Sequence, residues 1–172
     1  MKPRAAGLAL LLVAGAAGCG FGSTKTISKT GVVGQEFDGP GGLQVQLVRF
    51  LKRVPPPGND VSGLATPKPG THFVAFLIRM CINTTGLPTL SERNFTVPLA
   101  GGGEAELKFP ETVFTDDLDL LGTPGCEQGH VVFQVPRHRR ASDVRFSLDV
   151  AKGDAHGYTD TTKIRFDWKL PA

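Results

Sequence analysis

The chain has 172 residues, with 19 Lys and Arg against 16 Asp and Glu and a formal net charge of +3. Lys2 and Arg4 lie in the first 18 residues, so a chain without that segment keeps 17 bases against 16 acids. This near balance gives no global electrostatic case for a nucleic-acid partner. The roughly 150 residues that follow suffice for one domain with its own hydrophobic core.

The N-terminus has the layout of an export signal. Lys2 and Arg4 are followed by an apolar and small-residue run, residues 5–18, that ends directly before Cys19. Positive charge, apolar core and small residues in that order are typical of a secretory signal peptide. The run is shorter than the roughly 20 apolar residues of a membrane-spanning helix. We therefore assign residues 1–18 to a cleaved signal peptide.

The residues around the expected cut resemble a bacterial lipobox. Ala16, Ala17 and Gly18 precede Cys19, although lipoboxes usually carry Leu where Ala16 stands. In a lipobox the Cys is acylated, which would tether the domain to the extracytoplasmic face of the cell membrane; ordinary secretion is the alternative. The small, polar and basic residues 19–29 are then predicted to be a flexible tether, and residues 30–172 the folded domain.

The first predicted strands lie before a long loop. Residues 32–37 form a weak strand, and residues 43–47 alternate apolar Leu and Val with Gln in a clear half-buried one. The alternation slips at residues 48–51, which predicts a β-bulge. The proline-rich segment 54–70 follows as a loop, because prolines remove the N–H donors that a central strand needs.

Residues 71–85 are predicted to be the central strand. Apolar residues at every second position give it one continuous inner face, as a buried strand requires. Its other face begins apolar and then carries Arg79 and Cys81. The residues of the inner face are Val74, Phe76, Ile78, Met80 and Ile82.

Further short strands follow at close spacing. Residues 95–99 and 105–109 alternate on either side of three glycines at 101–103, which predicts a hairpin, and residues 116–121 suit one helical turn. Three more alternating segments are residues 131–135, 144–150 and 164–170. Many short strands, with turn signals between them and no long helix, predict an all-β, immunoglobulin-like antiparallel β-sandwich.

The cysteines predict one disulfide. With Cys19 at the N-terminus, Cys81 and Cys126 remain for the fold, and export places them where a disulfide persists. Both are out of phase with the inward-facing residues of their strands. We therefore expect the bridge to join neighbouring strands or a loop on an outer face, closing a loop of about 45 residues.

Several short motifs resemble those of one family. Phe-Val-Ala-Phe at residues 73–76 runs into Ile-Asn-Thr-Thr at 82–85, and Pro-Gly at 124–125 precedes His-Val-Val-Phe-Gln-Val-Pro at 130–136. With the hairpin at residues 95–106, they resemble the immunoglobulin-like family catalogued as domain of unknown function 4352, over most of the predicted domain. That family includes secreted antigens and lipoproteins of actinobacteria. The resemblance implies a fold and a location, and it supplies no catalytic residues.

No familiar catalytic or cofactor motif occurs in the chain. A nucleophile elbow, a P-loop and a dinucleotide-binding fingerprint are all missing from the sequence. The four histidines lie on separate predicted segments, which favours surface or strand-end positions over metal ligation. Asp116, Asp117 and Asp119 suit an exposed acidic loop better than a calcium site. The histidines are His72, His130, His138 and His156. We expect no enzyme, cofactor or metal.

A run of basic residues directly after Pro136 is the sharpest charge feature. It lies in the turn between two predicted strands and could contact anionic lipid headgroups or an envelope polymer; a solvated hairpin is the alternative. The run consists of Arg137, His138, Arg139 and Arg140. The sequence thus predicts a lipid-anchored envelope module that binds a protein or an envelope polymer. A small-ligand or metal carrier and an enzyme with an unrecognised site remain as alternatives.

Overall fold

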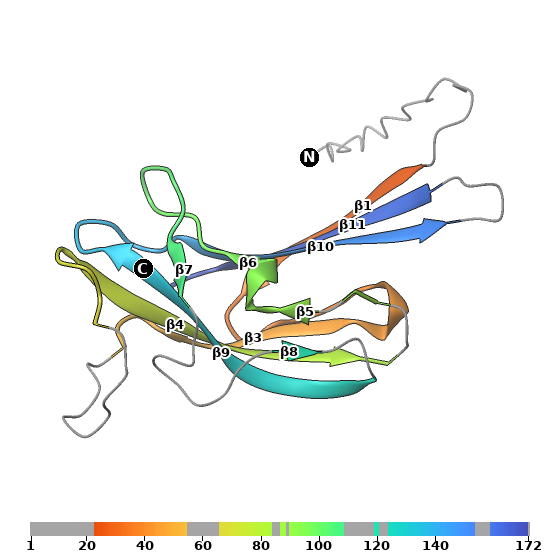
Figure 1. The fold of residues 1–172 in the computed structure, drawn as a ribbon, viewed down its shortest axis with the longest axis horizontal. Coiled ribbons are helices and arrows are strands. Elements are labelled where there is room, and N and C mark those ends of the chain that lie inside the picture. The colour runs from red at the N-terminus through yellow and green to blue at the C-terminus, as the bar shows by residue number, and fades with distance from the viewer. Residues whose placement is uncertain are drawn as a thin grey trace, which may run out of the picture.

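Two β-sheets lie face to face in the computed structural model, which describes residues 23–54, 66–83, 87–88, 90–108, 119–120, 124–153 and 159–171 (Figure 1). The strands are β1 (Thr24–Val32), β2 (Glu36–Asp38), β3 (Gln44–Leu51), β4 (Thr71–Ile82), β5 (Leu90–Ser91), β6 (Phe95–Thr96), β7 (Glu106–Lys108), β8 (Asp119–Leu120), β9 (Gly125–Pro136), β10 (Asp143–Gly153) and β11 (Thr159–Lys169), with short 3-10 helices η1 (Pro40–Gly42) and η2 (Glu92–Asn94). One sheet has the order β1-β11-β10-β6 and the other β2-β3-β4-β9-β7, while β5 and β8 pair separately. The predicted all-β sandwich is confirmed.

The core consists of the inward-facing residues of both sheets. On β10 and β11, Phe146 and Phe166 are completely buried and their ring centroids lie 5.8 Å apart. Trp168, also buried, donates a hydrogen bond from Nε1 to the carbonyl oxygen of Gln35 at 2.8 Å, so its polar atom is satisfied. Alternation of apolar and polar residues along each strand therefore separates the core face from the solvent face.

β4 is the central strand of its sheet, as the sequence predicts. It pairs with β3 on one side and β9 on the other, and its five predicted inner-face residues are all buried. Its outer face carries a smaller apolar cluster, in which Phe73 and Ala75 pack with Val132 of β9. The period-2 alternation thus located both faces correctly.

The predicted bulge in β3 is also present. The register between β3 and β4 shifts between Leu47 and Arg49. Before the shift Leu47 faces the core, and after it Phe50 faces inward and stacks on Phe76, with ring centroids 5.1 Å apart. A bulge moves the following residues to the opposite face of the strand.

The disulfide joins two neighbouring strands on an outer face, as predicted. Cys81 of β4 lies directly opposite Cys126 of β9, with a Cα–Cα distance of 4.0 Å. Cys81 alternates with the inward-facing Met80 and Ile82. The bridge spans 45 residues of sequence. In the chain-entropy model such a loop stabilises the fold by about 4 kcal/mol.

The tether prediction is wrong for residues 24–29, which form most of β1. This strand lies at a sheet edge and pairs in parallel with β11, with Ile27 opposite Ile164. Ile27 is half-buried against the core. Small polar residues predicted flexibility, but backbone pairing and one half-buried isoleucine hold the segment in the sheet. The predicted weak strand 32–37 is correspondingly replaced by the end of β1 and by β2.

The strands predicted to form a hairpin at residues 95–109 belong to different sheets. β6 pairs with β10, whereas β7 pairs with β9. The turn itself exists, with a bridge between Pro98 and Glu104 and positive φ angles at all three glycines of 101–103. The chain therefore crosses between the sheets at this turn. Residues 119–120 form β8 rather than part of a helical turn.

Candidate functional site

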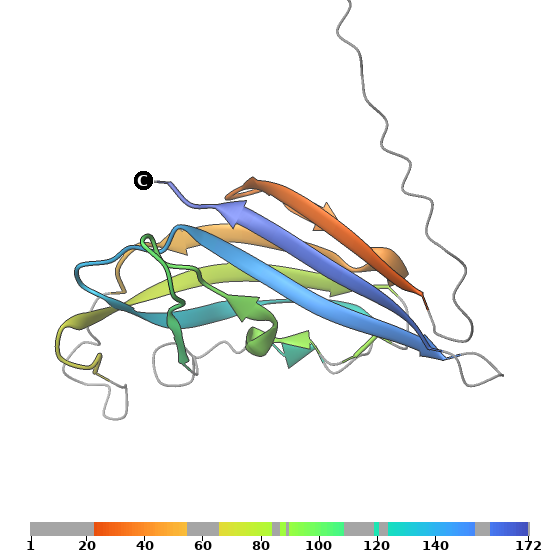
Figure 2. The same cartoon turned by 90° about the horizontal axis from the view of Figure 1, so that it is seen from above.

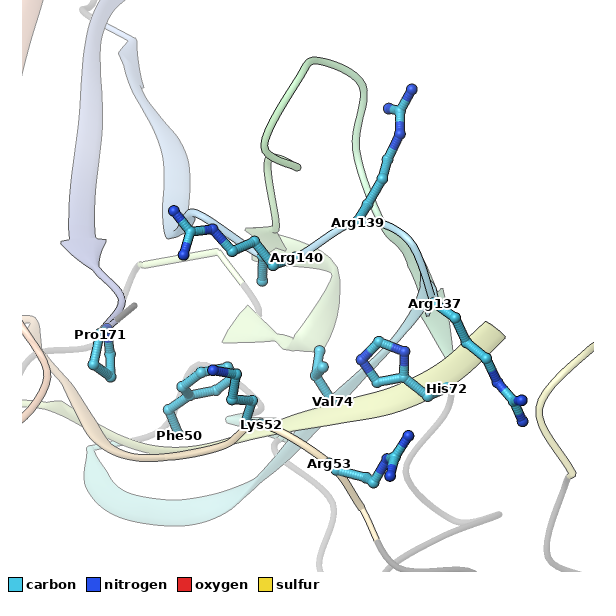
Figure 3. A pocket seen from close by; sticks show the side chains of 10 residues that line it. Phe50, Lys52, Arg53, His72, Val74, Arg137, Arg139, Arg140 and Pro171 are labelled. Carbon is cyan, nitrogen blue, oxygen red and sulfur yellow. The ribbon is translucent and has the colours of Figure 1, made fainter. Parts of the chain in front are cut away.

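A cavity of about 480 Å³ opens at one end of the sandwich, and we call it the basic pocket (Figure 3). Six of its ten lining residues carry basic side chains and four are apolar. The basic residues are Lys52, Arg53, His72, Arg137, Arg139 and Arg140, and the apolar ones are Phe50, Val74, Ala141 and Pro171. No acidic side chain occurs among these ten residues, so the described lining has an uncompensated positive charge.

The bulge in β3 places one wall of the basic pocket. After the register shift, Phe50 faces inward, and Lys52 lies two residues further along the chain. Both residues, with Arg53, line the cavity where β3 ends. The half-buried Phe50 ring, stacked on Phe76, supplies a fixed apolar surface beside two exposed cations.

His72 comes from the start of β4 and projects into the basic pocket. It is two residues before Val74, so the period of the strand brings it to the inner face, where it lies beside Val74 (Figure 3). Burial lowers the pKa of His72 below its usual value of 6.5, and repulsion from Arg53 and Arg137 lowers that pKa further. At neutral pH the imidazole is therefore mainly uncharged, able to donate one hydrogen bond and accept another.

The turn of residues 137–140 is braced by backbone contacts on two sides. The Arg137 N–H donates to the carbonyl oxygen of Gly70 at 2.9 Å, and its Nε donates to that of Thr71 at 3.3 Å. On the other side, Arg139 Nη1 donates to the carbonyl oxygen of Gly102. The turn is thus joined to the end of the proline-rich loop and to the glycine turn 101–103, which fixes its backbone and the side chains of Arg137 and Arg139 before any ligand arrives.

The four predicted contact residues do not have equivalent positions. Arg137 and Arg139 line the cavity, but their guanidinium groups are bound to carbonyl oxygens and point away from its centre (Figure 3). Arg140 also lines it and extends on the side where Pro171 lies. His138 is exposed and is not among the lining residues. Within the described part of the chain, Arg140, Lys52 and Arg53 have no hydrogen bond or ion pair that occupies their charged groups.

Three members of the site did not stand out in the sequence. Lys52 and Arg53 only follow the predicted bulge at residues 48–51, and the sequence favours a surface or strand-end position for His72. The sequence does contain a signal for each strand. The bulge determines which residues at the end of β3 face inward, and the alternation of β4 extends back to His72. The sequence could not show that the end of β3, the start of β4 and the end of β9 lie close together.

The proline-rich loop lies outside the described residues at 55–65. Its start is fixed, because the Val54 N–H donates a hydrogen bond to the Phe73 carbonyl oxygen at 3.0 Å.

A second, smaller cavity adjoins the basic pocket. This apolar groove, of about 270 Å³, is lined by Val32, Val33, Lys169, Leu170 and Pro171. Pro171 lines both cavities, so they lie next to each other with this residue between them. The ammonium group of Lys169 lies 2.6 Å from Asp143 Oδ1, which leaves the groove without a free charge among its described lining residues.

The described residues hold no cluster of three or more His, Cys, Asp or Glu side chains that could bind a metal ion. Nor does this part of the chain include a helix with the length and hydrophobicity to cross a membrane. Cys19 lies outside the described residues.

No protein-family model and no curated protein matches the chain. Among solved structures, MPT63, a secreted protein of Mycobacterium tuberculosis, is 12% identical with a TM-score of 0.49, over 83% of this chain and 98% of that one. The candidate lipoprotein YcdA of Bacillus subtilis is 13% identical with a TM-score of 0.46, over 75% of this chain. The chain spans only 38% of the YcdA chain. An uncharacterized β-sandwich protein of Clostridium difficile is 11% identical with a TM-score of 0.39, over 86% of this chain and 99% of that one.

Proposed function

We propose that this chain is a lipid-anchored, extracytoplasmic binding protein, not an enzyme, whose β-sandwich holds an anionic group in the basic pocket. The export signal and Cys19 support the location and the anchor. The Cys81–Cys126 disulfide suits an oxidising compartment. Membership of the family of domain of unknown function 4352 stays a prediction.

The composition of the basic pocket carries the proposal. Three of its cations, Lys52, Arg53 and Arg140, have no competing partner among the described residues, and they line one cavity from two segments of the chain. A rigid backbone lowers the entropy that a site loses when it binds an anion. The hydrogen bonds of Arg137 and Arg139 fix the turn from which Arg140 extends, and the stacked Phe50 ring precedes Lys52 and Arg53. The alternative, a solvated hairpin, does not account for a cavity that the turn shares with Lys52 and Arg53, which follow β3.

A linear polyphosphate tests the proposal, because it presents repeated anionic groups and no apolar part. The parent should bind it, with an affinity that falls steeply as salt increases, since mobile ions screen the attraction. Replacing Lys52, Arg53 and Arg140 together with Ser should weaken binding at least about a hundredfold, if each cation contributes about 1 kcal/mol. Isothermal titration of the full chain carrying Cys19→Ser measures the affinity without an acylated anchor.

The matched control removes the same number of charges elsewhere. Arg79, on the outer face of β4, and Lys163 and Arg165 of β11 are replaced together with Ser. This control should stay within about threefold of the parent, because surface charges away from the site act only through the screened net field. Equal losses in both variants, or a parent that binds no polyanion, would overturn the proposal.

A further inference from the structure

The proximity of the two cavities, which share Pro171, points to the chemical class of the ligand. The basic pocket offers cations, and the apolar groove begins on the other side of Pro171. A ligand that fills both needs an anionic end and an apolar end, joined across this proline.

The apolar groove exposes hydrophobic side chains to solvent. Val32, at the end of β1, is 60% exposed and is the one exposed large hydrophobic side chain among the described residues. Val33 and Leu170 are half-buried beside it. An apolar chain lying on these residues would remove their surface from water, which favours binding in proportion to the area covered.

We propose that the site binds a phosphorylated amphiphile, a phosphate ester whose head lies in the basic pocket and whose apolar chain follows Pro171 into the apolar groove. This inference rests on the proposed function and narrows its ligand. A phosphate monoester carries close to two negative charges at neutral pH and accepts several hydrogen bonds. Arginine guanidinium groups match phosphate oxygens in geometry, and here Arg53 and Arg140 are available together with Lys52. A carboxylate would bring a single charge to the same three cations.

Three small probes separate the head from the chain. Octyl phosphate, used below its micelle concentration, carries both parts; inorganic phosphate carries the head alone, and octyl glucoside the chain alone. Octyl phosphate should bind the full Cys19→Ser chain at least about tenfold more tightly than inorganic phosphate, because each methylene that leaves water favours binding. Octyl glucoside should bind more weakly than either.

The variant Val32→Ser isolates the groove. Val32 is exposed, so the change leaves the core intact. It should weaken octyl phosphate binding by about fivefold and leave inorganic phosphate within about twofold of the parent. The triple Ser variant of Lys52, Arg53 and Arg140 should lose both ligands. The control Thr30→Ser, exposed on the same strand and outside both cavities, should change neither.

The possible outcomes separate this inference from the proposed function. If polyphosphate and inorganic phosphate bind through the three cations but octyl phosphate gains nothing, or Val32→Ser has no effect, the amphiphile is wrong and anion binding stands. If no anion binds, both fall. Transfer of a fluorescent phosphatidic acid from phosphatidylcholine vesicles to the protein would identify a lipid as the source. Octyl phosphate binding without such transfer would identify a water-soluble phosphate ester of the same chemistry.

Discussion

His72 is a titratable residue that faces inward in a cluster of cations. Its position follows from the phase of β4, which makes residue 72 an inner-face position even though it lies at the end of the strand. Burial is the largest cause of its lowered pKa, and the charges of Arg53 and Arg137 add to it. The folded state thus disfavours the protonated imidazole, and the unfolded chain does not. An anion in the basic pocket would oppose this repulsion and raise the pKa of His72 again.

This difference predicts how acidification affects stability. Because the pKa of His72 is lower in the folded state, the unfolded state binds more protons below about pH 6.5, and stability falls as the pH decreases through that window. His72→Gln should remove this part of the pH dependence, so the parent should lose more free energy of unfolding than the variant between about pH 7.5 and 5.5. Urea denaturation at both pH values measures the difference. The lowered pKa values of Glu106, Asp143 and Asp160 act in a separate window, below their ordinary values of 4.5, 3.8 and 3.8. Identical pH slopes for parent and variant would contradict the assignment.

Arg137 and Arg139 show that neighbouring arginines in one turn can have different tasks. The guanidinium group of Arg137 donates a hydrogen bond to the carbonyl oxygen of Thr71, and that of Arg139 donates one to the carbonyl oxygen of Gly102. Arg140, next in sequence, has its charge free within the described part of the molecule and is the member of the turn that we assign to the ligand. The charges of the three arginines were evident in the sequence. The carbonyl partners of Arg137 and Arg139 come from segments about 35 to 65 residues away and could not be assigned from a local pattern.

At the scale of elements, β1 most clearly changes the interpretation of the sequence. Residues 24–29 were expected to move freely between anchor and domain, whereas the strand pairs with β11 along its whole length. The chain is already fixed at Ser23, whose N–H donates to Asp160 Oδ1 at 2.8 Å. Within the predicted tether, only residues 19–22 then remain between the expected anchor and the described fold.

Ile27 provides a test of that strand. It is half-buried against the core, so Ile27→Ser should lower the free energy of unfolding by about 1–2 kcal/mol through lost apolar contact. The exposed neighbour Thr26→Ser should change stability by less than about 0.5 kcal/mol. Chemical denaturation of the Cys19→Ser chain, followed by tryptophan fluorescence of the buried Trp168, provides the measurement. Equal stability of parent and Ile27→Ser would mean that the segment behaves as the tether first expected.

Elements with strong alternation were predicted well, and those defined by distant pairing were not. β4, the bulge of β3 and the Cys81–Cys126 bridge all follow from period-2 phase, which is a local property. β1 lacks alternating apolar residues, and its place depends on an edge of β11 more than 130 positions away in its register. The turn 101–103 was recognised from its glycines, but the choice of a different sheet for each flank depends on β9 and β10. The basic pocket combines both cases. The turn 137–140 was predicted from the sequence, whereas the lining residues near the ends of β3 and β4 were not.

At the scale of the whole molecule, the N-terminal end of the described fold and the basic pocket lie at opposite ends of the sandwich. Both views place the start of β1 at one end and the turn between β9 and β10 at the other (Figures 1 and 2). The 11 residues of β10 that separate these ends span about 35 Å. Residues 19–22 reach at most about 14 Å. In a domain anchored through Cys19, the end of the sandwich where β10 meets β11 would therefore lie next to the membrane. The basic pocket would then face away from the bilayer, toward ligands that leave the bilayer or arrive from outside it.

Energy transfer to the membrane tests this orientation. A donor dye on Lys152→Cys marks the end near Ser23, because Lys152 lies opposite Asp160 in the sheet. A donor on His138→Cys marks the exposed turn at the pocket end. When the acylated protein is reconstituted into vesicles with acceptor-labelled lipids, transfer from position 152 should clearly exceed transfer from position 138, since the two differ in height by about 30 Å when the domain stands upright. The Cys19→Ser versions should partition to the aqueous phase and give little transfer from either dye.

Equal transfer from both positions, or stronger transfer from position 138, would contradict this orientation. It would mean that the domain contacts the bilayer through its basic end. The anionic headgroups of the anchoring membrane would then occupy the basic pocket in place of a ligand from outside.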